Sequence, residues 1–178
     1  MLATVIALQS GESPLIAVLR SGRFGRPLWL LKFRTMWPKR GTLKYPMRLV
    51  EYVIDEAGPM RKGPSDERVP SRFARLCRRF SLDEIPQLLN VISGQMSLVA
   101  PRPLTGSELR EHYREHAAEV LSVKPGITGL WQISGRNSLT YAERRRLDIQ
   151  LIRTLTPMLY LRILLRTIPV VVTGRNSW

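Results

Sequence analysis

The chain is 178 residues long, and its hydrophobic content of 44% indicates a folded protein rather than a disordered segment. Lys and Arg number 28 against 14 Asp and Glu, so the formal net charge is +14, which favours anionic partners such as phosphorylated substrates, nucleic acid or an anionic membrane surface. The single cysteine, Cys77, excludes an internal disulfide and a thiolate zinc site, and the absence of a run of about 18 uncharged apolar residues excludes an ordinary membrane-spanning helix.

The first third of the sequence predicts two strands and then a basic segment. Turn residues surround a brief strand near Leu15–Leu19, and Pro27–Met36 predicts a second strand that runs into a polar end. Trp37–Gly63 is basic, and its middle part, residues 47–57 (MRLVEYVIDEA), favours a helix.

Three polar residues stand at the end of the second predicted strand. Lys32 and Arg34 are two positions apart and are expected to share one face, with Thr35 beside them. Two cationic side chains on one face could clamp a diphosphate. The alternative is the solvated face of a half-buried strand.

The middle of the chain predicts a basic helix, a second helix and a short strand. Arg72–Arg79 has a helical pattern, and Ser81 with Glu84 three residues later forms a predicted capping box ahead of an apolar run. Gly94 is expected to end that second helix. Met96–Ala100 follows as a short apolar strand or turn.

Asp83 and Glu84 are adjacent carboxylates at the start of the predicted second helix. The positive field of a helix N-terminus favours the ionised, nucleophilic form of a carboxylate, and the two groups could share a Mg²⁺ ion. Arginines that could hold phosphate oxygens lie just upstream: Arg75, Arg78 and Arg79. The alternative is a plain capping pair.

Two further arginines are candidate phosphate ligands. Arg102 lies between two prolines, which fix the backbone and would present the guanidinium preorganised, although a rigid turn with a solvated Arg fits as well. Arg136 lies in Lys124–Asn137, which is expected to be a glycine-rich loop that lets the backbone approach a ligand.

The last third predicts three helices. Ser107–Val120 is expected to be a charged, mostly exposed helix, and Thr140–Thr154 a second helix. Met158–Val172 is strongly apolar and is expected to be broken by Pro169. Because arginines are spaced through this apolar segment, it suits either an interfacial membrane helix or the protein core.

Three motifs occur in a specific order: KFRTM (residues 32–36), SLDEIPQLLNVISGQMSLVAPRP (81–103) and KPGITGLWQISGRN (124–137). In this order they resemble the bacterial sugar transferase family, the monotopic polyprenyl-phosphate phosphoglycosyl transferases. The resemblance covers about residues 10–175. It is strongest to the undecaprenyl-phosphate hexose-1-phosphate (galactose or glucose) transferases that begin exopolysaccharide synthesis.

The resemblance implies one α+β domain over residues 1–178, helix-rich and with a small β-sheet near the active site, that lacks the family's N-terminal re-entrant membrane helix. It implies that Asp83 attacks the β-phosphorus of a UDP-sugar, releases UMP and carries a covalent sugar phosphate, which undecaprenyl phosphate then accepts. Glu84 would help hold Mg²⁺, the expected cofactor, or handle a proton. The residues expected to bind the substrates are Lys32, Arg34, Thr35, Arg78, Arg102 and Arg136.

The expected partners are a UDP-sugar, undecaprenyl phosphate and the cytoplasmic face of the bacterial inner membrane, with no nucleic acid. Leu151 and Tyr160 depart from the family pattern, which tends to have Tyr and Asp at these positions. This departure and the short N-terminus leave a catalytically impaired paralogue as one alternative. A basic nucleic-acid-binding module is another, which the charge favours, but no helix-turn-helix, zinc, RRM or KH signature supports it.

Overall fold

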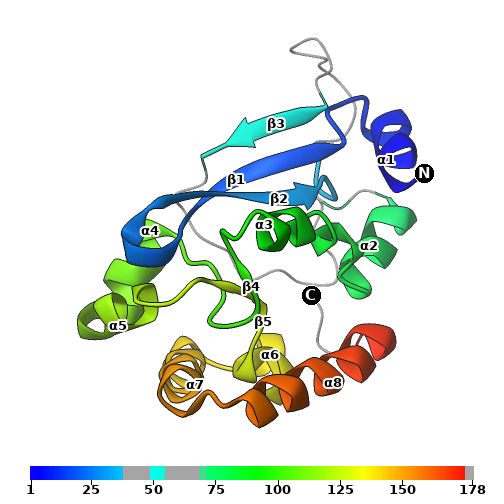
Figure 1. Ribbon diagram of the computed structural model, residues 1–178. Helices are drawn as coiled ribbons and strands as arrows, with labels where there is room; N and C mark the ends of the chain where they lie inside the picture. Colours follow the sequence, from blue (N-terminus) through cyan, green and yellow to red (C-terminus); the bar gives the residue numbers. More distant parts are fainter. Residues whose placement is uncertain (38–48, 55–68, 70, 175–178) are drawn as a thin grey trace.

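Helices and short strands are mixed along the chain of the computed structural model, which describes residues 1–37, 49–54, 69 and 71–174 (Figure 1). The first half contains α1 Leu2–Ser10, β1 Leu15–Ser21, η1 Arg23–Gly25, β2 Pro27–Phe33, β3 Val50–Val53, α2 Arg72–Arg79, η2 Leu82–Glu84 and α3 Gln87–Ile92. The second half contains β4 Ser97–Val99, α4 Gly106–Glu108, η3 Leu109–Tyr113, η4 Arg114–His116, α5 Ala117–Leu121, β5 Gly126–Thr128, α6 Leu130–Ser134, η5 Arg136–Ser138, α7 Tyr141–Thr154 and α8 Pro157–Thr173. The mixture confirms the expected helix-rich α+β class.

The larger sheet has the strand order β2-β1-β3. β1 and β2 form an antiparallel hairpin in which Leu15 pairs with Phe33 and Ser21 pairs with Pro27, so the proline stands at the first position of an edge strand. β3 pairs in parallel with the other edge of β1. Both strands predicted near the N-terminus are therefore confirmed, although β2 ends three residues earlier than Met36.

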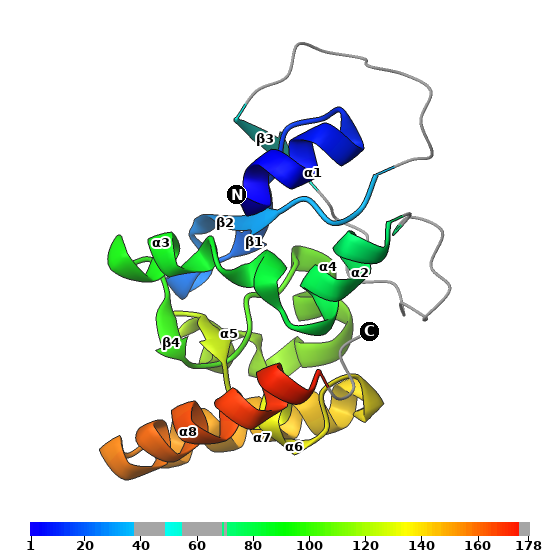
Figure 2. The same ribbon diagram turned by 90° about the vertical axis from the view of Figure 1, so that its right-hand side faces the viewer.

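Asn90 fixes α3 against the sheet. Its side-chain amide donates to the carbonyl of Trp29 at 3.0 Å, and its side-chain oxygen accepts from the backbone N–H of Leu31 at 3.2 Å. Because Asn90 is buried, the loss of these bonds would leave polar groups of both elements unpaired. This contact fixes α3 beneath β2 (Figures 1 and 2), and η2, the segment just before it that carries Asp83 and Glu84, also contacts β2.

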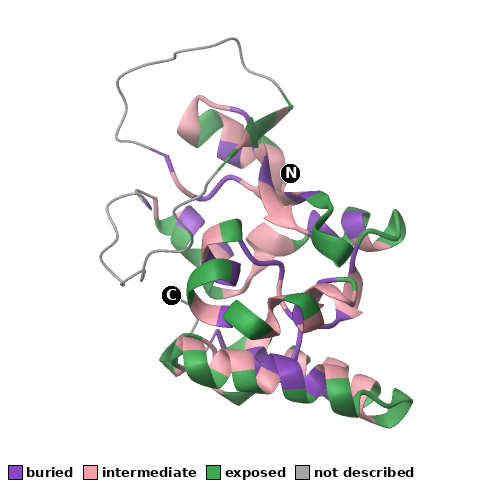
Figure 3. Ribbon diagram, turned by 90° about the vertical axis from the view of Figure 1, so that its left-hand side faces the viewer, coloured by how far each residue is buried: buried purple, intermediate pink, exposed green. Residues whose placement is uncertain are grey.

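The lower part of the molecule is a layer of helices, α6, α7 and α8, attached to the short parallel pair β4-β5. A cluster of Val99, Leu151 and Ile163 forms the core between them. Gly126 lies so close to the backbone of Ala100 that an added Cβ would meet its nitrogen at 2.3 Å, so only glycine allows this approach. Along the two long helices at the bottom, exposed residues alternate with half-buried and a few buried ones (Figure 3).

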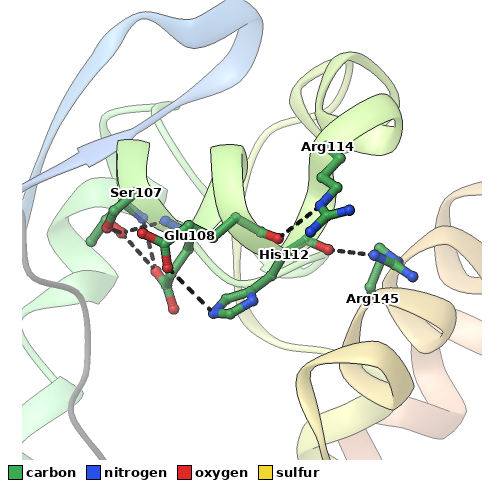
Figure 4. A network of polar contacts seen from close by, with 7 residues as sticks. Ser107, Glu108, His112, Arg114 and Arg145 are labelled. Carbon is green, nitrogen blue, oxygen red and sulfur yellow. Dashed lines mark hydrogen bonds and ion pairs between the residues drawn. The ribbon is translucent and has the colours of Figure 1, made fainter.

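The single helix predicted for Ser107–Val120 is wrong, because the segment divides into α4, a π-helical turn (η3), a 3-10 turn (η4) and α5. Thr105 and Glu108 form a capping box at its start, and Arg114 interrupts it with a φ of 43°. The segment is also partly buried, since Leu109 and Tyr113 belong to a core cluster. Arg145 of α7 donates to the carbonyl oxygen of His112 at 2.6 Å and fixes the π-helical turn to the lower layer (Figure 4).

Three other predictions of secondary structure need correction. Of residues 47–57, predicted as a helix, the described part forms strand β3, because the free edge of β1 supplies backbone partners; the remainder lies outside the described residues. Lys124–Asn137 is not a loop but contains β5, α6 and η5. α8 continues through Pro169, which is exposed and lies in the last turns, where few backbone bonds depend on it.

Candidate active site

The Asp83–Glu84 pair lies on the 3-10 turn η2, and the predicted capping box is wrong. Ser81 has a left-handed backbone (φ 54°) and its side chain caps no N–H group. Its hydroxyl instead accepts a hydrogen bond from Arg136 at 3.4 Å. Both acidic side chains are therefore free of a capping role and are available to the surrounding cations.

Glu84 lies between two cationic side chains from distant parts of the sequence. Its Oε1 accepts from Lys32 Nζ at 3.0 Å and from Arg102 Nη2 at 2.6 Å, and its Oε2 accepts from Arg102 Nη1 at 3.4 Å. Lys32 comes from the end of β2, and Arg102 from the turn between two prolines that follows β4. The carboxylate side chain is 17% exposed, so these charge-assisted bonds are only weakly screened.

The environment shifts the pKa values of the two acids in opposite directions. Burial raises the pKa of Asp83, and the charge of Glu84 adds to this, against the opposing effects of Lys32, Arg78 and Arg102. Burial by itself would also raise the pKa of Glu84, but the charges and hydrogen bonds of Arg102 and Lys32 outweigh it and lower this pKa well below its ordinary value. Glu84 is therefore held as the anion, whereas the ionisation of Asp83 responds to any further cation.

Arg78 and Arg136 complete the positive surroundings of the pair. Arg78 lies in the last turn of α2, and its charge acts on Asp83. Arg136 has a left-handed backbone (φ 52°) and contacts Ser81; burial lowers its pKa, and the charges of Glu84 and Arg102 both reach it. With Lys32 and Arg102, they bring four cations around two carboxylates, so the site has a net positive charge that suits a diphosphate.

The structure does not bring Arg34 to this cluster. The guanidinium of Arg34 donates to the carbonyl oxygen of Ser13 at 2.7 Å and forms ion pairs with Glu12, at 2.8 Å, and with Glu51. Because β2 ends at Phe33, the alternation that would place Lys32 and Arg34 on one face does not continue. The neighbouring Thr35 is buried.

Sequence patterns did not identify two residues that shape this site. Nothing in the spacing shows that the Ser81 hydroxyl meets Arg136, since the two residues are joined only by the folding of the chain. Cys77 lies near Asp83, and burial together with that charge raises its pKa, so it is a neutral packed thiol rather than a nucleophile.

The described side chains could supply only a few of the ligands that a metal ion needs. In the ranges that the structure describes, no group of three or more His, Cys, Asp or Glu side chains could hold a metal ion. A Mg²⁺ here would therefore need phosphate and water ligands, which is its usual mode of binding in phosphoryl transfer. The Asp83 carboxylate fits this role, since it makes no hydrogen bond to any described residue, whereas Glu84 already accepts from two cations.

α8 carries a stripe of exposed apolar side chains at helical spacing. The stripe comprises Met158, Leu161, Leu165, Ile168 and Val172. Two exposed arginines, Arg162 and Arg166, lie beside it. Among residues that the structure describes, no helix is both long and apolar enough to cross a bilayer.

Comparisons with known proteins agree on one class of enzyme. The family described as "Bacterial sugar transferase" matches residues 1–174. The chain is 40% identical over 179 residues to the exopolysaccharide production protein ExoY of Rhizobium meliloti (strain 1021), an alignment that covers 100% of this chain and 78% of that protein.

Two longer relatives have names that state a reaction. The undecaprenyl-phosphate galactose phosphotransferase of Salmonella typhimurium is 38% identical over 165 residues, which are 89% of this chain and 33% of that protein. The UDP-glucose:undecaprenyl-phosphate glucose-1-phosphate transferase of Caulobacter vibrioides is 35% identical over 184 residues, which are 99% of this chain and 63% of that protein. The chain thus corresponds to only a third of the first of these relatives.

Proposed function

The chain belongs to the bacterial sugar transferase family, and from this premise we propose that it transfers a hexose-1-phosphate from a UDP-sugar to undecaprenyl phosphate and releases UMP. Membership confirms the resemblance seen in the three sequence motifs and the prediction of an enzyme. The names of the Salmonella and Caulobacter relatives support this reaction, with galactose and glucose as the first sugars to test.

The proposed chemistry has two steps centred on Asp83. In the first, an Asp83 carboxylate oxygen forms a bond to the β-phosphorus of the UDP-sugar, the bond from that phosphorus to the bridging oxygen breaks, and UMP leaves with the bond's electrons. In the second, a phosphate oxygen of undecaprenyl phosphate attacks the same phosphorus and the Asp83 carboxylate is restored. A carboxylate nucleophile suits such a two-step route.

The observation that carries the proposal is the position of Asp83 among Lys32, Arg78 and Arg102, with Glu84 beside it. Phosphoryl transfer depends mainly on positioning and on stabilisation of negative charge, which preorganised cations provide. Lys32 and Arg102 would contact the diphosphate, and Arg136 would reach it from the other side of Ser81. A bound Mg²⁺, held by Asp83 and phosphate oxygens, would neutralise charge on the diphosphate.

We also place the enzyme at the cytoplasmic face of the inner membrane, where its lipid acceptor lies. The apolar stripe on α8 and the neighbouring Arg162 and Arg166 are typical of a helix that lies in the membrane interface. The net charge of +14 favours anionic lipid headgroups. This placement supplies the lipid substrate without a spanning helix in the described residues.

UMP release from UDP-galactose and UDP-glucose, with undecaprenyl phosphate in detergent, tests the proposal. We expect release by the wild-type chain and at least a thousandfold loss in Asp83→Asn, with the exposed capping residue changed in Glu143→Gln as the matched control. Absence of UMP from the wild type would contradict the proposed reaction. Tight, strongly salt-dependent binding to nucleic acid without turnover would favour the alternative of a nucleic-acid-binding module.

A further inference from the structure

The carboxylate oxygens of Glu84 are already occupied by cationic hydrogen-bond donors, unlike those of a typical metal ligand. Both of its carboxylate oxygens accept hydrogen bonds from cations, Oε1 at 3.0 Å from Lys32 and at 2.6 Å from Arg102, and Oε2 more weakly from Arg102. A Mg²⁺ ion requires an oxygen at about 2.0–2.1 Å in near-octahedral surroundings, free of competing donors. A divalent ion on Glu84 would stand beside two positive charges and would have to displace at least one of them.

Lys32 and Arg102 both form an ion pair with Glu84. They come from β2 and from the turn after β4, and the described contacts join them only through this carboxylate. Two cations close together repel each other, and an anion between them offsets that repulsion. Both keep further N–H donors after bonding to Glu84, so they can bind a phosphate without releasing it.

We propose that Glu84 is a positioning residue that holds Lys32 and Arg102 at the spacing that a diphosphate needs, and that Asp83 alone of the pair binds the divalent cation. The inference rests on the proposed function, since it takes a diphosphate as the ligand of the two cations. It replaces the expectation that Glu84 shares the metal or handles a proton.

A direct measurement of metal binding distinguishes the role of Asp83 from that of Glu84. Mn²⁺ serves as the probe, and electron paramagnetic resonance of the free ion measures its binding to the full chain in detergent with UDP present. We expect Glu84→Gln to keep the Mn²⁺ affinity within about twofold of wild type and Asp83→Asn to lose at least about tenfold, because one carboxylate normally supports such a site. Equal losses in both variants, or no Mn²⁺ bound by the wild type, would overturn the proposal.

Kinetics of UMP release test the positioning role. Glu84→Gln is expected to lower kcat by about 10–100-fold, while the half-saturating Mg²⁺ concentration stays within about twofold. The matched control is Glu119→Gln, which weakens an equally close pair with Arg153 (2.7 and 2.8 Å) on the surface and is expected to leave both values unchanged. Restoration of kcat by excess Mg²⁺ in Glu84→Gln would contradict the positioning role.

A double-mutant cycle shows whether Glu84 acts through its partner. If it does, Glu84→Gln slows an Arg102→Gln enzyme by a clearly smaller factor than it slows the wild type. Factors that multiply fully would show an independent role for Glu84 and contradict the proposal. A wild-type chain that releases no UMP would contradict the proposed function, whereas the Mn²⁺ measurement would still decide the role of Glu84.

Discussion

Two carboxylates, the half-buried Glu84 of the candidate active site and the fully buried Asp148 of the lower helical layer, differ in how the protein stabilises the same chemical group. Glu84 accepts from Lys32 and Arg102, and its pKa falls far below its ordinary value despite burial. Asp148 is fully buried, and its Oδ2 accepts one bond of 2.6 Å from the hydroxyl of Tyr113.

The result for Asp148 is the reverse of that for Glu84. Burial raises the pKa of Asp148 to about 7, against the opposing effects of Tyr113 and Arg144. No described group bonds to its other oxygen, Oδ1. A carboxylate thus stays charged where cations bond to it, whereas a carboxyl group buried without a bonded cation keeps its proton up to about pH 7, so the partners of the acids identify the site better than the acids themselves.

The largest expected effect comes from removal of the arginine that keeps Glu84 charged. If Arg102 contacts the diphosphate as proposed, Arg102→Gln should lower kcat for UMP release by about 100–1,000-fold, because that preorganised donor is lost and Glu84 loses its closest hydrogen-bond partner. Enzyme kinetics on protein verified as folded by circular dichroism check this. A loss below tenfold would mean that Arg102 acts outside the reaction.

The next largest effect is a dependence of stability on pH that originates from Asp148. Because its pKa is about 7 in the folded chain and about 4 when unfolded, the folded state alone holds the proton between these values, and stability falls as pH rises through this window. From about pH 5 to about pH 8 the loss should be on the order of 2–3 kcal/mol by urea denaturation, and Asp148→Asn should abolish it. An unchanged slope in the variant would contradict this origin.

A smaller loss is expected when the partner of Asp148 is removed. Tyr113→Phe should lower the free energy of unfolding by about 1–2 kcal/mol, and by more at pH 8 than at pH 5, because the ionised carboxylate then lacks its only described donor. Tyr160→Phe, in a half-buried tyrosine packed against the lower core, is the control and should change stability by less than about 0.5 kcal/mol. Similar losses in the two variants would contradict the importance of the hydrogen bond.

The smallest effect is expected for an ion pair that burial does not strengthen. Arg153 donates to Glu119 through two of its nitrogens, Nε and Nη2, at the surface, and the Arg153 side chain is 62% exposed. Arg153→Gln should change the free energy of unfolding by less than about 1 kcal/mol and leave UMP release unchanged, in contrast to Arg102→Gln. A large activity loss would show that arginine removal in general, rather than the position of Arg102, affects the enzyme.

The sequence predicted those parts of the molecule that local pattern and motif determine. The strand pair at β1 and β2, helices α2 and α7, and the Asp83 region could be identified because their apolar spacing, caps and motifs lie within a few residues. The sequence did not reveal what Arg34 binds, because its partners Glu12 and Glu51 reach it only through the folded sheet. For the same reason it assigned Glu84 to a capping box, although Lys32 and Arg102 hold it.

Trapping of the covalent intermediate tests the central claim most directly. The chain is mixed with its UDP-sugar in the absence of undecaprenyl phosphate, and the peptide that contains Asp83 is analysed by mass spectrometry. We predict one hexose-phosphate on Asp83, formed together with UMP, lost on addition of undecaprenyl phosphate, and absent from Asp83→Asn. Release of UMP only when undecaprenyl phosphate is present, with no adduct at any time, would contradict the account.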